Sequence, residues 1–146
     1  MFKETPRFIG IDIGTKRSGV ALASFDNKLV SNSWVVNHGE VSATKKLELI
    51  LSSIKYPIKA LIIGYPFHMN QSTDSKISDS QKNVLEVINL LNENYPEIIV
   101  IRVDERLTTK SSIDLGHSLG LNEKQMRDKK DAISAMFILD VYLHQE

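Results

Sequence analysis

The stretch FIGIDIG, residues 8–14, decides how this chain is expected to fold. Isoleucines alternate with glycines and one aspartate, and an alternation of period two indicates a β-strand. The isoleucines would share one face, and the other face would carry Asp12 between two glycines. A carboxylate inside an apolar strand costs free energy unless it is paired or bound to a cation. Asp12 is therefore either a metal ligand, with the glycines leaving room for a metal ion and a phosphate, or a carboxylate satisfied by a salt bridge or turn hydrogen bonds.

The segments around this strand indicate further strands and helices. Gly14-Thr15-Lys16 is a turn signal, so the first strand is expected to form a hairpin with the next one. The expected strands cover residues 7–13, 18–24, 28–36, 60–64 and 97–103. The expected helices, which have apolar residues at helical spacing, cover residues 41–55, 78–94, 108–119 and 130–144. Residues 66–76 are polar and are expected to form a loop.

This order of elements predicts an α/β fold with a mixed five-stranded sheet. Three consecutive strands indicate an antiparallel meander, and the two later strands are reached through helices and should run parallel. Helices would cover both faces of the sheet. Ribonuclease-H-like folds have this architecture, and other folds share it. Because 146 residues suit one core, residues 1–146 are expected to form a single domain.

The composition is that of an ordinary globular protein, with 42% apolar and 25% charged residues. No apolar run is long enough for a membrane span, and no signal-peptide segment precedes the first strand. The absence of cysteine excludes disulfides and thiolate metal sites, and the expected location is the cytoplasm. Eighteen basic residues balance eighteen acidic ones, whereas nucleic-acid binders are often basic overall. A basic patch can still be local, as at Lys16-Arg17 and over residues 124–130, although such clusters are often plain solvated surface.

More acidic residues appear where the last predicted strand ends, at Asp104 and Glu105. Strand ends in sheets of this kind open onto the crevice where ligands bind. Adjacent residues on an extended backbone point to opposite faces, so only one of these two acids can easily share a site with Asp12. The alternative for them is an ion pair with Arg106 and a cap on the following helix.

Asp131 is expected at the start of the last helix, where the helix dipole alone stabilises a carboxylate. Small residues follow it, so this helix could approach the sheet closely and bring Asp131 toward the strand ends. Three carboxylates at one edge would suit Mg²⁺ or Mn²⁺. Two such ions, about 4 Å apart, could activate water and stabilise the leaving oxygen in phosphodiester hydrolysis. Spacing alone does not establish that the acids converge.

Four segments resemble the motifs of the YqgF-type bacterial proteins, which belong to the ribonuclease-H-like superfamily. These segments are IGIDIGTKRSGVA (residues 9–21), IGYP (63–66), DERLTT (104–109) and the terminal helix that begins DAISA (131–135). They follow the family's order and spacing over residues 8–143. Members of the family are described as nucleases for the 5′ end of precursor 16S ribosomal RNA and as Holliday-junction resolvases.

The resemblance implies a metal-dependent endonuclease in which Asp12, Glu105 and Asp131 bind the metal and carry catalysis. It favours Glu105 over Asp104, a choice that geometry left open. The implied cofactor is Mg²⁺ or Mn²⁺, as two ions, and the implied partner is nucleic acid, either structured RNA or branched DNA. Precursor 16S ribosomal RNA is the preferred substrate, and a Holliday junction is the alternative. The sequence does not show whether the protein is a monomer or a homodimer.

One loop departs from the family's pattern. Where the family usually has Asn-Met-Asp-Gly, this chain has His68-Met69-Asn70-Gln71, so a loop acid and its glycine are missing. The departure puts substrate binding by this loop in doubt, but it leaves the core acids in place.

Lys16, Arg17 and Arg106 are the candidate contacts to substrate phosphates. The first two lie in the predicted hairpin turn and either contact phosphate or are simply solvated, and Arg106 could instead pair with a neighbouring acid. The four histidines show no metal-ligand spacing and are expected at the surface. Trp34 is expected in the core, and Phe67 is the better candidate for stacking on a base.

Two functions of other classes stay open. Asp12-Ile13-Gly14-Thr15 resembles the first phosphate loop of the actin-like and sugar-kinase superfamily, but those enzymes usually need two domains, and this chain is too short for that. A non-catalytic nucleic-acid-binding module would fit the altered loop and the neutral net charge. Its weakness is that unpaired acids clustered at a sheet edge destabilise a fold that has no cation there.

Overall fold

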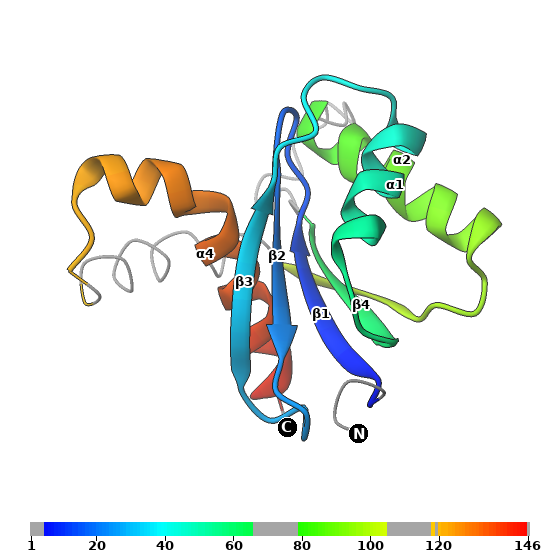
Figure 1. Cartoon of the computed structure of the whole chain (residues 1–146). Helices are drawn as coiled ribbons and strands as arrows, with labels where there is room; N and C mark the ends of the chain where they lie inside the picture. The colour runs from blue at the N-terminus through cyan, green and yellow to red at the C-terminus, as the bar shows by residue number, and fades with distance from the viewer. Residues whose placement is uncertain (1–4, 66–78, 105–117, 119, 146) are drawn as a thin grey trace, which may run out of the picture.

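A computed structural model describes residues 5–65, 79–104, 118 and 120–145 of the chain (Figure 1). Its elements, in chain order, are β1 (Arg7–Asp12), β2 (Ser18–Ala23), β3 (Val30–Val36), α1 (Ala43–Ser53), β4 (Ile58–Tyr65), α2 (Asp79–Asn94), β5 (Val100–Asp104) and α4 (Glu123–Leu143). Each of these strands begins and ends within three residues of a predicted strand.

The strands form one five-stranded sheet in the order β3-β2-β1-β4-β5. β2 is antiparallel to both β1 and β3, whereas β4 is parallel to both β1 and β5. The predicted architecture, an antiparallel meander followed by two parallel strands, is confirmed. Since β2 alone runs against the others, its amino end and the carboxyl ends of the other four strands meet along one edge of the sheet. This edge, at the top in Figure 1, is called the upper edge below.

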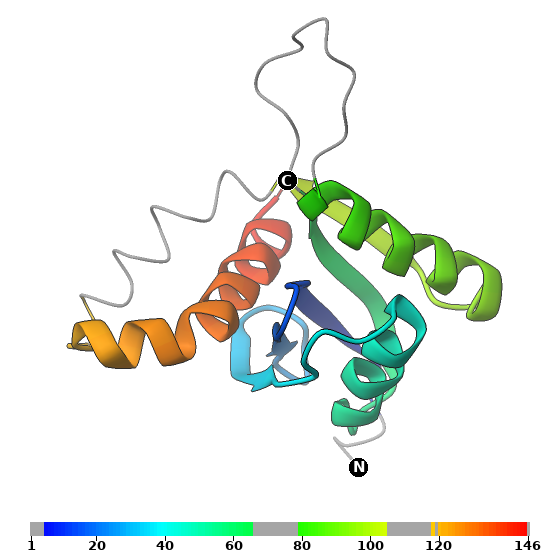
Figure 2. The same cartoon turned by 90° about the horizontal axis from the view of Figure 1, so that it is seen from above.

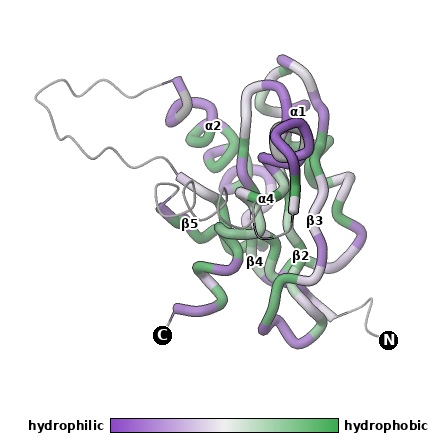
Figure 3. Tube along the Cα trace, turned by 90° about the vertical axis from the view of Figure 1, so that its left-hand side faces the viewer, coloured by the Kyte–Doolittle hydropathy of each residue, from purple (hydrophilic) through white to green (hydrophobic). Residues whose placement is uncertain are grey.

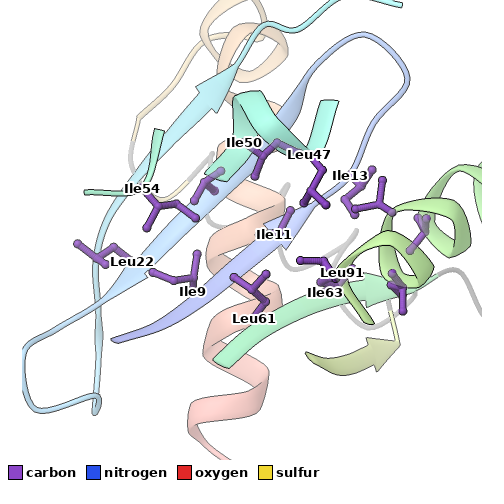
Figure 4. Packing of buried hydrophobic residues seen from close by; sticks show 14 residues of the cluster. Ile9, Ile11, Ile13, Leu22, Leu47, Ile50, Ile54, Leu61, Ile63 and Leu91 are labelled. Carbon is purple, nitrogen blue, oxygen red and sulfur yellow. The ribbon is translucent and has the colours of Figure 1, made fainter. Parts of the chain in front are cut away.

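Helices cover both faces of the sheet, with α1 and α2 on one side and α4 on the other (Figure 2). The first face carries the larger core, in which Ile9 and Ile11 of β1 pack with Leu47 of α1 and Leu91 of α2 (Figure 4). None of these four side chains is more than 3% exposed, and fully burying such a side chain stabilises the fold by about 1.5–3 kcal/mol. The isoleucine face of FIGIDIG therefore lies in this core. Figure 3 shows that hydrophobic residues lie along the central strands, whereas hydrophilic residues lie along much of α1.

On the other face, α4 lies unusually close to β1 and β2 because glycines face it. A Cβ at Gly10 would lie 2.6 Å from the Ala135 carbonyl oxygen, and a Cβ at Gly19 would lie 1.8 Å from the Asp131 carbonyl oxygen. Ordinary van der Waals contact for a Cβ begins at 3.4 Å. The helix backbone can rest on the sheet only because these two strand positions have no side chain. This contact sets how close Asp131 comes to the strands.

The start of α4 differs from the prediction. The helix begins at Glu123, not at residue 130. The Asn122 side chain accepts a hydrogen bond from the Gln125 backbone N–H at 2.8 Å, and the Gln125 side chain accepts one from the Asn122 backbone N–H at 3.0 Å. This capping box satisfies two N–H groups that the first turn leaves without helical partners. Asp131 consequently lies in the interior of α4, and the expectation that the first-turn dipole stabilises it is wrong.

Two predicted segments fall outside the described residues. They are the loop over residues 66–76 and, apart from Ser118, the helix over residues 108–119. Among the helices that the structure describes, none has the length and hydropathy needed to cross a membrane.

Candidate active site

Asp12 ends β1 at the upper edge and lies on the face that α4 covers. The preceding residue, Ile11, points into the α1/α2 core, so Asp12 takes the opposite face. Its partner across the strands is Gly19, the residue against which the Asp131 backbone rests. Directly opposed residues of antiparallel strands have Cα atoms about 4.5–5.5 Å apart. The sheet and α4 thus bring Asp12, which is 9% exposed, to the same place as Asp131.

Arg17 reaches Asp131 from the turn between β1 and β2. Its Nε lies 3.1 Å from Asp131 Oδ2, with 49% of the Arg17 side chain and 14% of the Asp131 side chain exposed. The sequence left open whether Arg17 contacts phosphate or is merely solvated. The structure anchors the guanidinium on Asp131 while half of the side chain stays accessible. A guanidinium has five N–H donors, so this ion pair leaves donors available to a ligand.

Lys16 is placed differently although it is next to Arg17. Its side chain is 74% exposed, and its Nζ lies 4.0 Å from a carboxylate oxygen of Glu40. Exposed pairs of this kind contribute at most about 1 kcal/mol, because water and salt screen them. Lys16 is therefore a surface cation in the turn that follows Asp12, and its ion-pair partner is Glu40.

A series of hydrogen bonds connects the same turn to the segment that follows β3. The Gly14 backbone N–H donates to Ser18 Oγ at 3.2 Å, and Ser18 Oγ lies 2.9 Å from His38 Nε2. His38 Nδ1 lies 2.7 Å from the Gly39 carbonyl oxygen, and the Gly39 N–H donates to the Lys16 carbonyl oxygen at 2.7 Å. His38 is 7% exposed, so the expectation of a surface histidine is wrong at this position. Burial lowers the pKa of His38. Ser18 and His38 are twenty residues apart, and no local pattern indicates that they meet.

Asp104 ends β5 at the upper edge, but on the opposite face from Asp12. Val103 packs in the cluster beneath α4, so Asp104, one residue later in the strand, lies on the α1/α2 side. It does not share a face with Asp12 and Asp131. Glu105 and Arg106, the other candidates from this segment, lie outside the described residues.

The remaining candidates are structural, exposed or outside the described residues. Trp34 packs against the α1/α2 core, as predicted, and its Nε1–H donates to Ser53 Oγ at 2.9 Å. His144 is exposed, as predicted. Phe67, His68 and His117 are outside the described residues.

The donors at this site suit a hard divalent cation. Asp12 and Asp131 offer carboxylate oxygens, which are the ligands that Mg²⁺ and Mn²⁺ prefer. The glycines around them do not leave open space, because backbone of α4 and of the turn lies against them. Over residues 5–65, 79–104, 118 and 120–145, no three His, Cys, Asp or Glu side chains gather into a complete metal site. Among the described residues, Asp12 and Asp131 are the two carboxylates placed so that they could contribute to such a site.

Curated relatives resemble the chain over nearly its whole length. A protein of Phocaeicola vulgatus is 32% identical over 143 residues, which cover 96% of this chain and 96% of the relative. A protein of Christiangramia forsetii is 32% identical over 141 residues, which cover 95% of this chain and 98% of the relative. Both relatives carry the name "Putative pre-16S rRNA nuclease".

Solved structures share the fold at much lower sequence identity. RuvC of T. thermophilus in complex with a Holliday junction substrate has a TM-score of 0.52 at 13% identity, covering 95% of this chain and 96% of that one. The yeast mitochondrial Holliday junction resolvase has a TM-score of 0.55 at 12% identity, covering 96% of this chain and 78% of that one. The likeness confirms the predicted ribonuclease-H-like fold.

The family is shown by a match that covers almost the entire chain. A sequence model described as "RuvX: Holliday junction resolvase" matches residues 6–145. This range includes Asp12, Arg17 and Asp131, the residues that meet at the upper edge. With relatives named as nucleases and a fold shared with resolvases, the chain belongs to the RuvX family of Holliday junction resolvases and is a phosphodiester-cleaving nuclease.

Proposed function

We propose that the chain is a divalent-metal-dependent endonuclease that processes the 5′ end of precursor 16S ribosomal RNA, with Asp12, Glu105 and Asp131 as its metal ligands. The ligands would hold two ions, Mg²⁺ or Mn²⁺. The observation that carries the proposal is the crossing of α4 over β2, where the Asp131 backbone rests on Gly19, the strand partner of Asp12. Carboxylate oxygens that two different elements bring to one partly buried place are the ligands that Mg²⁺ and Mn²⁺ prefer, and Asp131 can bind such an ion while it also pairs with Arg17.

Glu105 is proposed as the third ligand because of the place of its neighbour. Asp104 lies on the α1/α2 side, away from Asp12. Successive residues of an extended chain take opposite faces, so the residue after Asp104 is the better candidate for the face of Asp12. The family resemblance of the segment DERLTT, residues 104–109, supports the same choice.

Each residue has its own part in such a reaction. A bound divalent cation would lower the pKa of a water molecule and stabilise charge on the scissile phosphate. Asp12 and Asp131 would hold that cation. Arg17, anchored 3.1 Å from Asp131, donates hydrogen bonds to a non-bridging phosphate oxygen. Lys16, exposed in the same turn, and Arg106 contact the nucleic-acid backbone.

Two nucleic acids are candidate substrates. The names of the relatives favour precursor 16S ribosomal RNA, whereas the description of the family favours a Holliday junction. The test compares cleavage of a 5′-extended 16S RNA fragment with cleavage of a four-way DNA junction, in Mg²⁺ and in Mn²⁺. Faster metal-dependent cutting of the junction would reverse the assignment. Binding to either substrate without cutting would identify a non-catalytic module.

The ligand assignment is tested with Asp12→Asn and Asp131→Asn, and Asp104→Asn is the matched control at the same edge. The first two changes should lower the cleavage rate at least about a hundredfold, because each removes several kcal/mol of charge stabilisation. They should also weaken Mn²⁺ binding, measured by paramagnetic relaxation of water. Asp104→Asn should leave both properties near wild type. An equal loss in the control would show that the assignment of faces is wrong.

A further inference from the structure

His38 lies buried at the upper edge, next to the candidate site but not in it. It follows β3 in the chain, and its ring contacts Ser18 at the start of β2 and the Gly39 carbonyl group. Burial lowers the pKa of His38, and the charges of Lys46 and Asp131 contribute to it with opposite sign. The imidazole is buried and each ring nitrogen has a hydrogen-bond partner, but the proposed reaction gives it no part.

The partners of the ring determine where its proton lies. A carbonyl oxygen only accepts, so Nδ1 must carry the hydrogen that is donated to Gly39. Ser18 Oγ already accepts from the Gly14 N–H, and its own hydroxyl hydrogen can then be donated to His38 Nε2. A neutral imidazole protonated on Nδ1 gives each donor and acceptor in this series of hydrogen bonds a partner. A second proton on Nε2 would take away the acceptor of the Ser18 hydroxyl.

These hydrogen bonds hold the β1–β2 turn at two residues, Gly14 and Lys16. Ser18, held by His38, fixes the Gly14 N–H just beyond β1, and the Gly39 N–H fixes the Lys16 carbonyl in the middle of the turn. Arg17, whose Nε lies 3.1 Å from Asp131 Oδ2, comes between Lys16 and Ser18 in the sequence. Any motion of the turn would move the guanidinium relative to Asp131.

We propose that His38 is a positioning residue for the nuclease reaction, which through Ser18 holds the turn so that Arg17 stays on Asp131. The catalytic consequence rests on the proposed function, whereas the hydrogen-bonded arrangement does not. The hydrogen bonds of His38 go to Ser18 and Gly39, so it acts on the site through the turn.

Two substitutions separate positioning from simple stability. In His38→Gln, the longer side chain can place its amide oxygen where Nε2 was, so it keeps an acceptor for Ser18 and loses the donor to Gly39. In His38→Asn, the shorter amide can replace the Nδ1 donor but does not reach Ser18. Each variant loses one hydrogen bond, so the two melting temperatures should fall by similar amounts.

Only the link to Ser18 matters if the inference is right. In His38→Asn, kcat for the better cleaved of the two substrates should fall about two- to tenfold, the ratio that one hydrogen bond supports, with KM unchanged. His38→Gln should keep the wild-type kcat. Equal losses in both variants, or losses that follow melting temperature, would overturn the inference.

A second measurement does not depend on activity. The Arg17 Nε–H resonance should exchange with water about two- to tenfold faster in His38→Asn, because the hydrogen bond between residue 38 and Ser18 is lost. Exchange in His38→Gln should match wild type. If the wild-type protein cuts neither nucleic acid, the proposed function fails, and this exchange measurement still decides the positioning role. Unchanged exchange in His38→Asn would refute it.

Discussion

Replacing Gly19 with alanine would place a methyl group inside the backbone of α4. The added Cβ would lie 1.8 Å from the Asp131 carbonyl oxygen, 2.2 Å from its carbonyl carbon and 2.8 Å from the Ala132 nitrogen. All three are backbone atoms and cannot rotate away. Since ordinary contact begins at 3.4 Å, the helix must move by about 1.6 Å, and forcing a group into a packed core costs about 1–3 kcal/mol. A displacement of about 1 Å at a reaction centre can lower a rate about a hundredfold.

Gly19→Ala should therefore lower cleavage at least about a hundredfold while the protein still folds, with a melting temperature lower by about 3 °C for each kcal/mol lost. Gly120→Ala is the control. Gly120 precedes α4 and has φ +74°, and a Cβ there meets nothing within 4 Å. That change strains the backbone without touching the crossing, so it should lower stability and leave cleavage unchanged. Wild-type cleavage by folded Gly19→Ala would refute the argument that this contact places Asp131.

Three further predictions concern stability. Asn122→Ala removes the capping box of α4 and should lower the free energy of unfolding in urea by about 1 kcal/mol, an effect that Asn122→Ser should largely avoid. Leu61→Ala in the fully buried centre of β4 should cost about 2–5 kcal/mol in the same assay, and a loss below about 1 kcal/mol would contradict its place in the core. Burial holds the pKa of His38 below its ordinary value of 6.5, so below that pH the unfolded chain binds the proton more readily and stability falls. Above pH 6.5, protonation of His38 no longer changes the free energy of unfolding. The difference in urea midpoint between about pH 8 and about pH 5.5 should therefore be smaller in His38→Gln than in wild type.

The strands could be predicted because their signal is local. Alternation in FIGIDIG reflects one buried apolar face, and the continuous apolar run from Ala60 to Gly64 reflects a strand covered on both sides. Helix ends were harder. The Asn122 and Gln125 pair is a visible start signal, but the polar first turns of α4 lack the apolar stripe that the prediction followed.

For the candidate site, too, the sequence indicated some residues correctly and left the placement of others to the structure. The sequence indicated Asp12, because a carboxylate between glycines in an apolar strand needs an explanation. It also singled out Asp131 through the family resemblance. The alternative explanation, stabilisation by the first-turn dipole, is wrong because Asp131 lies in the middle of α4. It left Asp104 and Glu105 as alternatives, and the packing of Val103 beneath α4 then placed Asp104 on the far side.

The sequence by itself determined the strands, the isoleucine face of β1, the position of Asp12 opposite that face, and the family. Only the tertiary structure decided that Asp131 meets the strand partner of Asp12, that Arg17 pairs with Asp131, and that His38 is buried against Ser18. The physical reason is that periodicity records which side of an element is buried, not which distant residue covers it. That choice depends on how closely one backbone can approach another, and here the missing side chain of Gly19 allows the approach.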